Sequence, residues 1–131
     1  MNLLELSQQY QGATLPQLVE KQIKSLNEAT LLEAIQGTYE NFPAEHRPTI
    51  DSYTMNYLKN WFGPHIVTAD LGAVFDEAVE DIKAMASENH IPLNDDLVFD
   101  VFNLTVMRLS HFAQSRPKFR KQLGIKKGWF S

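Results

Sequence analysis

The sequence predicts an all-α protein. Apolar residues recur at three- and four-residue spacing along most of the chain, which is the period of a helix with one buried face. Residues that favour helix starts and ends stand where these stretches begin and stop, and sustained strand-like alternation is hard to find. We therefore expect a compact single-domain bundle of six to seven helices over residues 1–131.

Three helices are expected early in the chain, at residues 2–11, 15–26 and 31–42. Gly12 is a natural end for the first. Thr14 and Gln17 have the spacing of a capping box, in which each side chain bonds the other residue's backbone amide, and they start the second. Residues 30–33 (TLLE) repeat this spacing and start the third, which Pro43 closes.

A loop bounded by prolines, FPAEHRP at residues 42–48, precedes the fourth predicted helix. Thr49 is its expected cap, and the helix should run over residues 50–62. Aromatic residues recur along it every four positions, so they share one face. Such a stripe favours core packing over the stacking of a planar ligand. Its members are Tyr53, Tyr57 and Trp61.

The most apolar helices come next. Thr68 is the expected cap of a fifth helix that extends to residue 89 with apolar residues along four turns. Asn94 should cap a sixth helix near residues 95–115, in which ten of the sixteen residues from 97 to 112 are apolar. A helix this apolar belongs at the centre of a bundle, with the fourth and fifth helices packed on it. Pro117 should begin one last short helix.

Charge is divided unevenly along the chain. The formal net charge is −4, yet all 16 acidic residues and five basic ones lie in residues 1–100, while residues 101–131 hold seven basic residues. The two parts therefore carry −11 and +7. Such a split favours either docking of one part on the other or the recruitment of a charged partner.

The basic residues gather with aromatic rings in residues 116–131, which we call the basic-aromatic segment. It could dock on the chain's own acidic fifth helix, bind an acidic protein groove, or contact nucleic acid or an anionic membrane. We favour a non-catalytic protein-interaction or regulatory module with a protein partner, and the alternative is an accessory nucleic-acid-binding protein. The expected contacts are Arg116, Lys118, Phe119, Arg120, Lys121 and Trp129.

A second alternative is a small-molecule-binding or catalytic pocket beside the aromatic helix. Two histidines flank that helix in sequence, and they would form a polar pocket if its ends were close. The residues of this alternative pocket are His46, Arg47, Tyr57, Trp61 and His65. For His111, on the polar side of the sixth helix, we expect a structural hydrogen bond.

Several classes of function lack their sequence signature. The chain contains no cysteine, which excludes disulfides, thiolate metal sites and a cysteine nucleophile. The acids at residues 76–81 occur without the Glu-x-x-His spacing of carboxylate metal bundles, so we expect a solvated face, no metal and no cofactor. Nucleophile-elbow and phosphate-loop motifs are missing. With neither a signal peptide nor a membrane span in view, a cytoplasmic location is expected.

Overall fold

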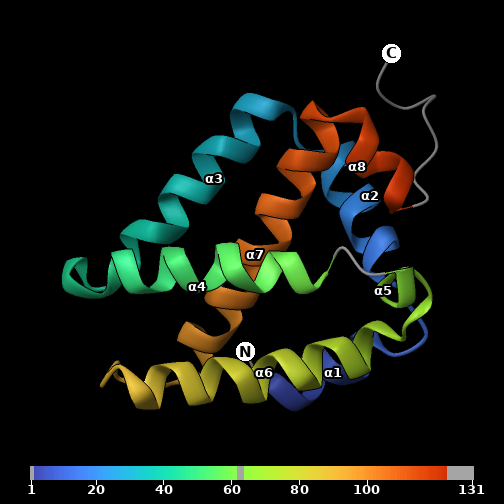
Figure 1. Ribbon diagram of the computed structural model, residues 1–131. Coiled ribbons are helices and arrows are strands. Elements are labelled where there is room, and N and C mark those ends of the chain that lie inside the picture. The colour runs from blue at the N-terminus through green and yellow to red at the C-terminus, as the bar shows by residue number, and fades with distance from the viewer. Residues whose placement is uncertain (1, 62–63, 124–131) are drawn as a thin grey trace.

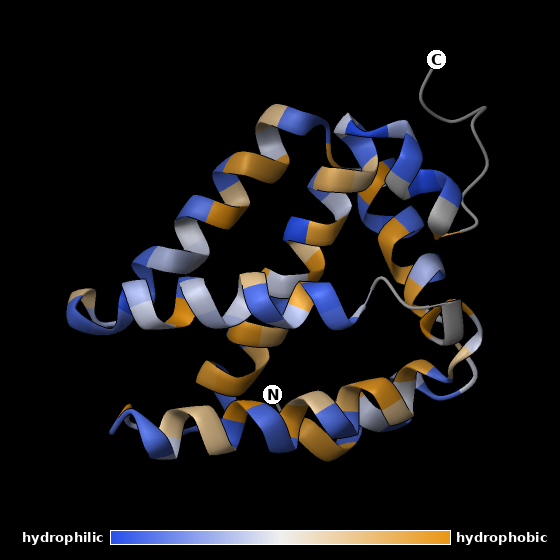
Figure 2. Ribbon diagram, viewed as in Figure 1, coloured by the Kyte–Doolittle hydropathy of each residue, from blue (hydrophilic) through white to orange (hydrophobic). Residues whose placement is uncertain are grey.

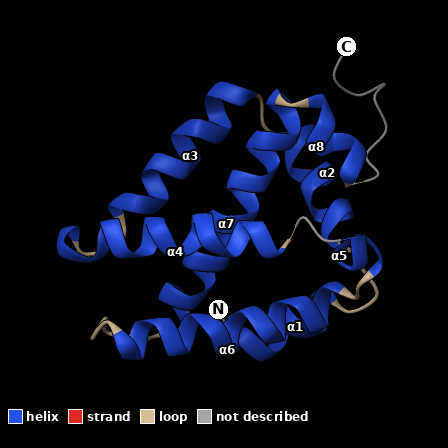
Figure 3. Ribbon diagram, viewed as in Figure 1, coloured by secondary structure: helices blue, strands red, loops and turns tan. Residues whose placement is uncertain are grey.

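The computed structural model describes residues 2–61 and 64–123, and their regular structure is entirely helical, as predicted (Figures 1 and 3). Six helices have eight or more residues, and short α8 completes the predicted set. The additional helix α5 has only five residues and was not predicted. The elements are α1 (Leu3–Tyr10), α2 (Leu15–Ser25), α3 (Glu28–Glu40), the 3-10 helix η1 (Ala44–His46), α4 (Arg47–Asn60), α5 (Pro64–Thr68), α6 (Leu71–Glu88), α7 (Asp95–Ser115) and α8 (Pro117–Gln122).

Helix α7 is the centre of the structure, which confirms the prediction from its apolar composition. It contacts α2, α3, α4, α6 and α8, and Figure 1 shows it passing behind α4 with other helices at both of its ends. Leu97, Leu104 and Met107 fall outside its main apolar arc, yet all three are buried. A helix with neighbours on several sides buries most of its circumference, so apolar residues all round it are required.

A cluster of rings joins four helices around Phe102 of α7. The Phe102 ring centroid lies 4.8 Å from that of Phe75 on α6, 5.8 Å from that of Trp61 and 5.9 Å from that of Tyr10 on α1. The pairs with Phe75 and Trp61 meet edge to face, the geometry that the charge distribution of aromatic rings favours. This cluster fixes where α1, α4 and α6 meet the central helix, and Figure 2 shows the apolar stretches of these helices.

Two of the predicted helix starts are confirmed by the hydrogen bonds that cap them. The Gln17 amide donates to Thr14 Oγ1 at 3.4 Å, and the Thr14 amide donates to Gln17 Oε1 at 3.0 Å, so the capping box forms in full. At α7, the Leu97 amide donates to Asn94 Oδ1 at 2.8 Å. Each bond satisfies a backbone amide that has no partner within its helix.

Three other predicted caps were wrong. Helix α3 is capped by Asn27, whose Oδ1 accepts from the Thr30 amide at 2.8 Å, so this helix begins before Thr30. Helix α4 begins at Arg47 inside the predicted loop, because Pro48 in its first turn needs no amide partner. Thr68 ends α5, and the cap of α6 is Asp70. Asp70 is the better cap because its carboxylate accepts from α6 through one oxygen and from the Gly12 amide through the other.

Candidate functional site

The basic-aromatic segment begins on a helix that packs against the rest of the protein. Helix α8 contacts α7, and Leu123, which follows it, is only 2% exposed. Arg116, Lys118 and Lys121 are exposed, whereas Arg120 is half-buried. The first part of the segment therefore carries its charges on a helix that is anchored by an apolar side chain.

The aromatic part of the segment is described less fully. The backbone of Phe119 belongs to α8, but its side chain lies outside the described part of the structure, as does the whole of Trp129. The Arg116 guanidinium carbon lies 5.0 Å from the centroid of the Phe112 ring, within the range of a cation–π contact. A ring from α7 thus borders the cationic surface.

The residues of the alternative pocket lie at the two ends of α4. His46 and Arg47 stand at its start, whereas Tyr57 and Trp61 lie near its end. At a rise of about 1.5 Å per residue, Arg47 lies roughly 15 Å along the helix from Tyr57 and roughly 20 Å from Trp61. His65 is in α5, and its side chain is outside the described part of the structure. Among the described side chains, the structure does not bring this set together.

Arg47 has structural partners instead. Its Nε donates to the Phe42 carbonyl at 3.1 Å and its Nη2 to the Glu40 carbonyl at 3.3 Å. These carbonyls belong to the end of α3 and the turn after it, where backbone acceptors have no helical partner. His46 Nε2 lies 3.6 Å from Glu45 Oε1. Both residues therefore shape the connection between α3 and α4.

A groove runs between α4 and α6, which we call the α4–α6 groove. Two adjoining cavities of about 240 and 370 Å³ make it up, and Tyr57, Asn60 and Asp81 line both. Trp61 lines the first cavity and Tyr53 the second. The aromatic stripe of α4 therefore divides: Trp61 is 2% exposed and belongs to the core, while both tyrosines are half-buried along the groove.

Carboxylates of α6 give the α4–α6 groove its electrostatic character. Glu77 and Asp81 line the first cavity, and Asp81 and Glu88 line the second. Burial raises the pKa of the Tyr57 hydroxyl, and the negative charges of Asp81 and Glu77 raise it further. Burial is also the main cause of the raised pKa of Tyr53. At neutral pH the groove thus combines neutral phenol groups with anionic carboxylates.

The remaining acids of this stretch have partners on the other side of α6. Asp76 Oδ1 accepts a hydrogen bond from the Ser7 hydroxyl of α1 at 2.6 Å, and Glu80 Oε1 lies 4.0 Å from Lys83 Nζ. The face of α6 that was predicted to be solvated therefore consists of two separate surfaces. One contacts α1, and the other forms the acidic side of the α4–α6 groove.

A polar cluster that was not predicted from the sequence ties three helices together. Arg108 of α7 bonds the Tyr39 hydroxyl of α3 and the Asp51 carboxylate of α4, and Tyr39 also donates to Asp51. Arg108 Nη1 lies 2.9 Å from the sulfur of Met55, and Arg108 Nε is buried without a hydrogen-bond partner among the described atoms. No local motif marks this cluster, because its members are far apart in sequence.

His111 makes the structural hydrogen bond expected from its position. Its Nε2 lies 3.2 Å from Glu28 Oε1, which joins α7 to the first turn of α3. No competing role as a general base is needed to account for this side chain.

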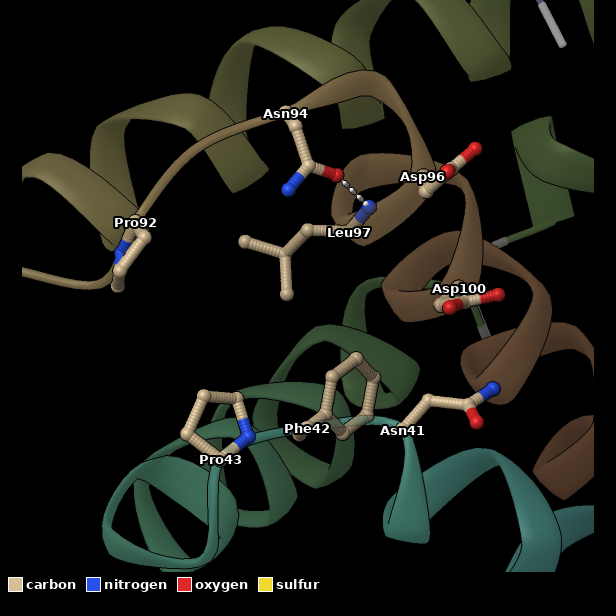
Figure 4. A pocket seen from close by; sticks show the side chains of 8 residues that line it. All are labelled: Asn41, Phe42, Pro43, Pro92, Asn94, Asp96, Leu97 and Asp100. Atoms are coloured by element: carbon tan, nitrogen blue, oxygen red, sulfur yellow. Dashed lines mark hydrogen bonds between the residues drawn. The ribbon is translucent and has the colours of Figure 1, made fainter.

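A cavity of about 520 Å³ lies where the turns after α3 and before α7 meet (Figure 4). Pro43, Pro92 and Leu97 form an apolar side, while the Asp96 and Asp100 carboxylates lie on the other. Burial raises the pKa of Asp100, and Asp96 raises it further. The helix dipole favours the negative charges of Asp95 and Asp96, which lie in the first turn of α7, whereas Asp100 lies beyond that turn.

The described residues contain no group of three or more histidine, aspartate or glutamate side chains suited to a metal ion. None of the described helices combines the length and hydropathy needed to cross a bilayer. No protein-family model, curated protein or solved structure matches the chain. A function for this chain is therefore argued from its own surfaces.

Proposed function

We propose that the chain is a non-catalytic protein-interaction or regulatory module that binds a protein partner through its basic-aromatic segment. The observation that carries this proposal is the display of Arg116, Lys118 and Lys121 on or beside α8, while Leu123 anchors the end of that helix. An anchored helix holds its charges in a fixed arrangement, so less side-chain and backbone freedom is lost on binding.

The chemistry of the segment favours an acidic protein surface. Exposed cations accelerate association with a surface of opposite charge, and rings such as Phe119 and Trp129 are typical anchors at the centre of an interface. The chain as a whole has a net charge of −4. Nucleic-acid-binding domains are typically basic as a whole, which this chain is not, and we therefore place the protein partner ahead of a nucleic acid.

The test is affinity capture from the source cell with three full-length forms: wild type, Lys118→Glu/Lys121→Glu, and the control Lys21→Glu/Lys59→Glu. All four lysines are exposed, so both double variants change the charge equally without touching the core. Wild type and control should retain the same protein, and the α8 variant should lose it while its circular dichroism and melting stay unchanged.

Equal retention by all three forms would contradict the proposal. Retention of nucleic acid by wild type, with an affinity that falls steeply between about 50 and 200 mM salt, would favour the nucleic-acid alternative instead.

A further inference from the structure

The α4–α6 groove has the shape and chemistry of a receptor for an extended, positively charged segment. Helices α4 and α6 each pack on α7, and the two adjoining cavities lie between them. Tyr53 and Tyr57 stand on the α4 side with their ring centroids 5.7 Å apart, and Asp81 stands on the α6 side. Rings beside carboxylates suit a lysine, because its ammonium is attracted to both.

The negative charge of this groove is not balanced within the described structure. Glu77, Asp81 and Glu88 form none of the ion pairs found there, whereas neighbouring Glu80 pairs with Lys83 on the opposite side of α6. Three carboxylates on one side of a groove, without a cation among the described residues, leave a negative potential that favours a cationic occupant.

A second, independent feature of the groove is the Tyr53 hydroxyl. This oxygen is buried and has no hydrogen-bond partner in the described structure. An unsatisfied buried hydroxyl is destabilising, typically by about 1–3 kcal/mol. If the Tyr53 side chain turns toward the groove, the backbone of an occupying segment carries both donors and acceptors for this hydroxyl.

The chain itself contains a segment with the complementary chemistry. Residues 124–131 read GIKKGWFS and combine Lys126 and Lys127 with Trp129 and Phe130. Along α4, the eight steps from Tyr53 to Trp61 give a rise of about 12 Å, a length that four residues span when extended. Lys126 to Trp129 is a stretch of four residues.

We propose that the α4–α6 groove receives residues 124–131 of a second copy of this chain. The inference rests on the proposed function, since it names the partner of the basic-aromatic segment. The chain is acidic over residues 1–100 and basic beyond them, so two copies can pair groove to segment. Lysine ammonium groups then lie beside the Tyr57 ring and the Asp81 carboxylate, with the Trp129 ring against Tyr53.

This pairing joins two different surfaces, so it is head to tail. A head-to-tail contact leaves one free groove and one free segment at the ends, and the assembly grows with concentration unless it closes into a ring. Because the contact is between exposed charges, it should weaken as salt rises.

The test uses full-length chains that lack one half of the contact. Asp81→Lys places a positive charge in the groove and leaves the segment unchanged. Lys126→Glu/Lys127→Glu leaves the groove unchanged and reverses the charge of the segment. The matched control is Glu80→Lys, the same charge change one residue away on the side of α6 that already holds Lys83. Asp81 and Glu80 are both exposed, so neither change disturbs the core.

We expect the wild-type mass in sedimentation equilibrium to rise with concentration and to fall at high salt. Each half-variant alone should remain a monomer, and their equimolar mixture should form a one-to-one dimer. The Glu80→Lys chain should behave as wild type. In the Lys126→Glu/Lys127→Glu chain, a synthetic GIKKGWFS peptide should bind with a dissociation constant about two- to thirtyfold lower than a GIEEGWFS peptide, the range expected for two lost charge pairs.

Three outcomes would overturn the inference. A wild-type chain that stays monomeric while the peptide binds would mean that a chain's own segment, or another protein, occupies the groove. A chain that neither associates nor binds the peptide would mean that the groove takes no such segment. Association unaffected by Asp81→Lys would place the contact elsewhere. The proposed function is judged separately, because a wild-type chain that stays monomeric can still capture a different protein through Lys118 and Lys121.

Discussion

Replacing Gly72 with alanine tests whether α1 and α6 approach as closely as the structure has them. A methyl carbon at Gly72 would lie 3.1 Å from the Ser7 carbonyl oxygen, 3.0 Å from Gln11 Cγ and 2.9 Å from Asp70 Oδ2. The first of these atoms belongs to the backbone of α1, which moves only if the helix moves. The last belongs to the carboxylate that caps α6 and accepts from the Gly12 amide at 2.6 Å.

The expected change in the free energy of unfolding for Gly72→Ala is the sum of opposing effects. Alanine is favoured over glycine in a helix by up to about 1 kcal/mol. Overpacking opposes this by about 1–3 kcal/mol, and disturbance of the Asp70 cap adds about 1 kcal/mol. The net expectation is a loss of about 1–3 kcal/mol. Gly37 of α3 is the matched control, because a methyl carbon there meets no atom within 4 Å. Gly37→Ala should therefore stabilise the protein by about 0.5–1 kcal/mol.

Urea unfolding followed by far-ultraviolet circular dichroism measures both changes. The midpoint should fall for Gly72→Ala and rise for Gly37→Ala, with the slope of free energy against urea unchanged in each. If Gly72→Ala were as stabilising as Gly37→Ala, the close contact of α1 with α6 would not exist in solution.

Two further predictions concern the pair of Asp51 with Arg108 and the tyrosines of the α4–α6 groove. Asp51→Asn should destabilise the protein by about 1–2 kcal/mol, because it weakens a bond to Arg108 whose side chain is only 20% exposed, and the 49% exposure of Asp51 keeps the loss below that of a fully buried pair. A double-mutant cycle with Arg108→Met checks this, and a coupling energy near zero would show that the two side chains act independently. Tyr53 and Tyr57 should ionise above the ordinary tyrosine pKa of 10.0. Since the folded state then holds protons that the unfolded state releases, stability should be unaffected below about pH 10 and fall as the pH rises further. Alkaline titration of tyrosinate absorbance, beside chemical unfolding at each pH, measures both, and a Tyr53→Phe/Tyr57→Phe chain with the same pH dependence would contradict the assignment.

Local patterns predicted most of the helices because the signals for them are local. The capping box of Thr14 and Gln17 and the cap at Asn94 lie next to the helices they start. The apolar composition of α7 was enough to place it at the centre. The start of α3 was missed because Asn27 precedes Thr30 and provides a cap first. Where two capping residues lie three positions apart, the pattern alone does not decide between them.

The candidate surfaces depend on how helices pack, so the sequence predicted them only in part. Tyr39, Asp51 and Arg108 meet although the last is 57 residues from Asp51 and 69 from Tyr39. The aromatic stripe of α4 was expected to pack, and it does, but only Trp61 is fully buried, whereas Tyr53 and Tyr57 are half-buried against the core. The position of α6 decides which of these rings are buried, and the spacing of residues within α4 does not indicate where α6 lies.

The place of α7 in the chain also bears on how the protein is made. Helices α2, α3 and α4 each rest on a helix that begins only at Asp95. On the ribosome, these earlier helices must wait with their apolar faces uncovered until α7 emerges, about five to twenty seconds after residue 1 at ordinary rates of synthesis. The nascent chain therefore exposes apolar surface until most of its residues have been synthesised.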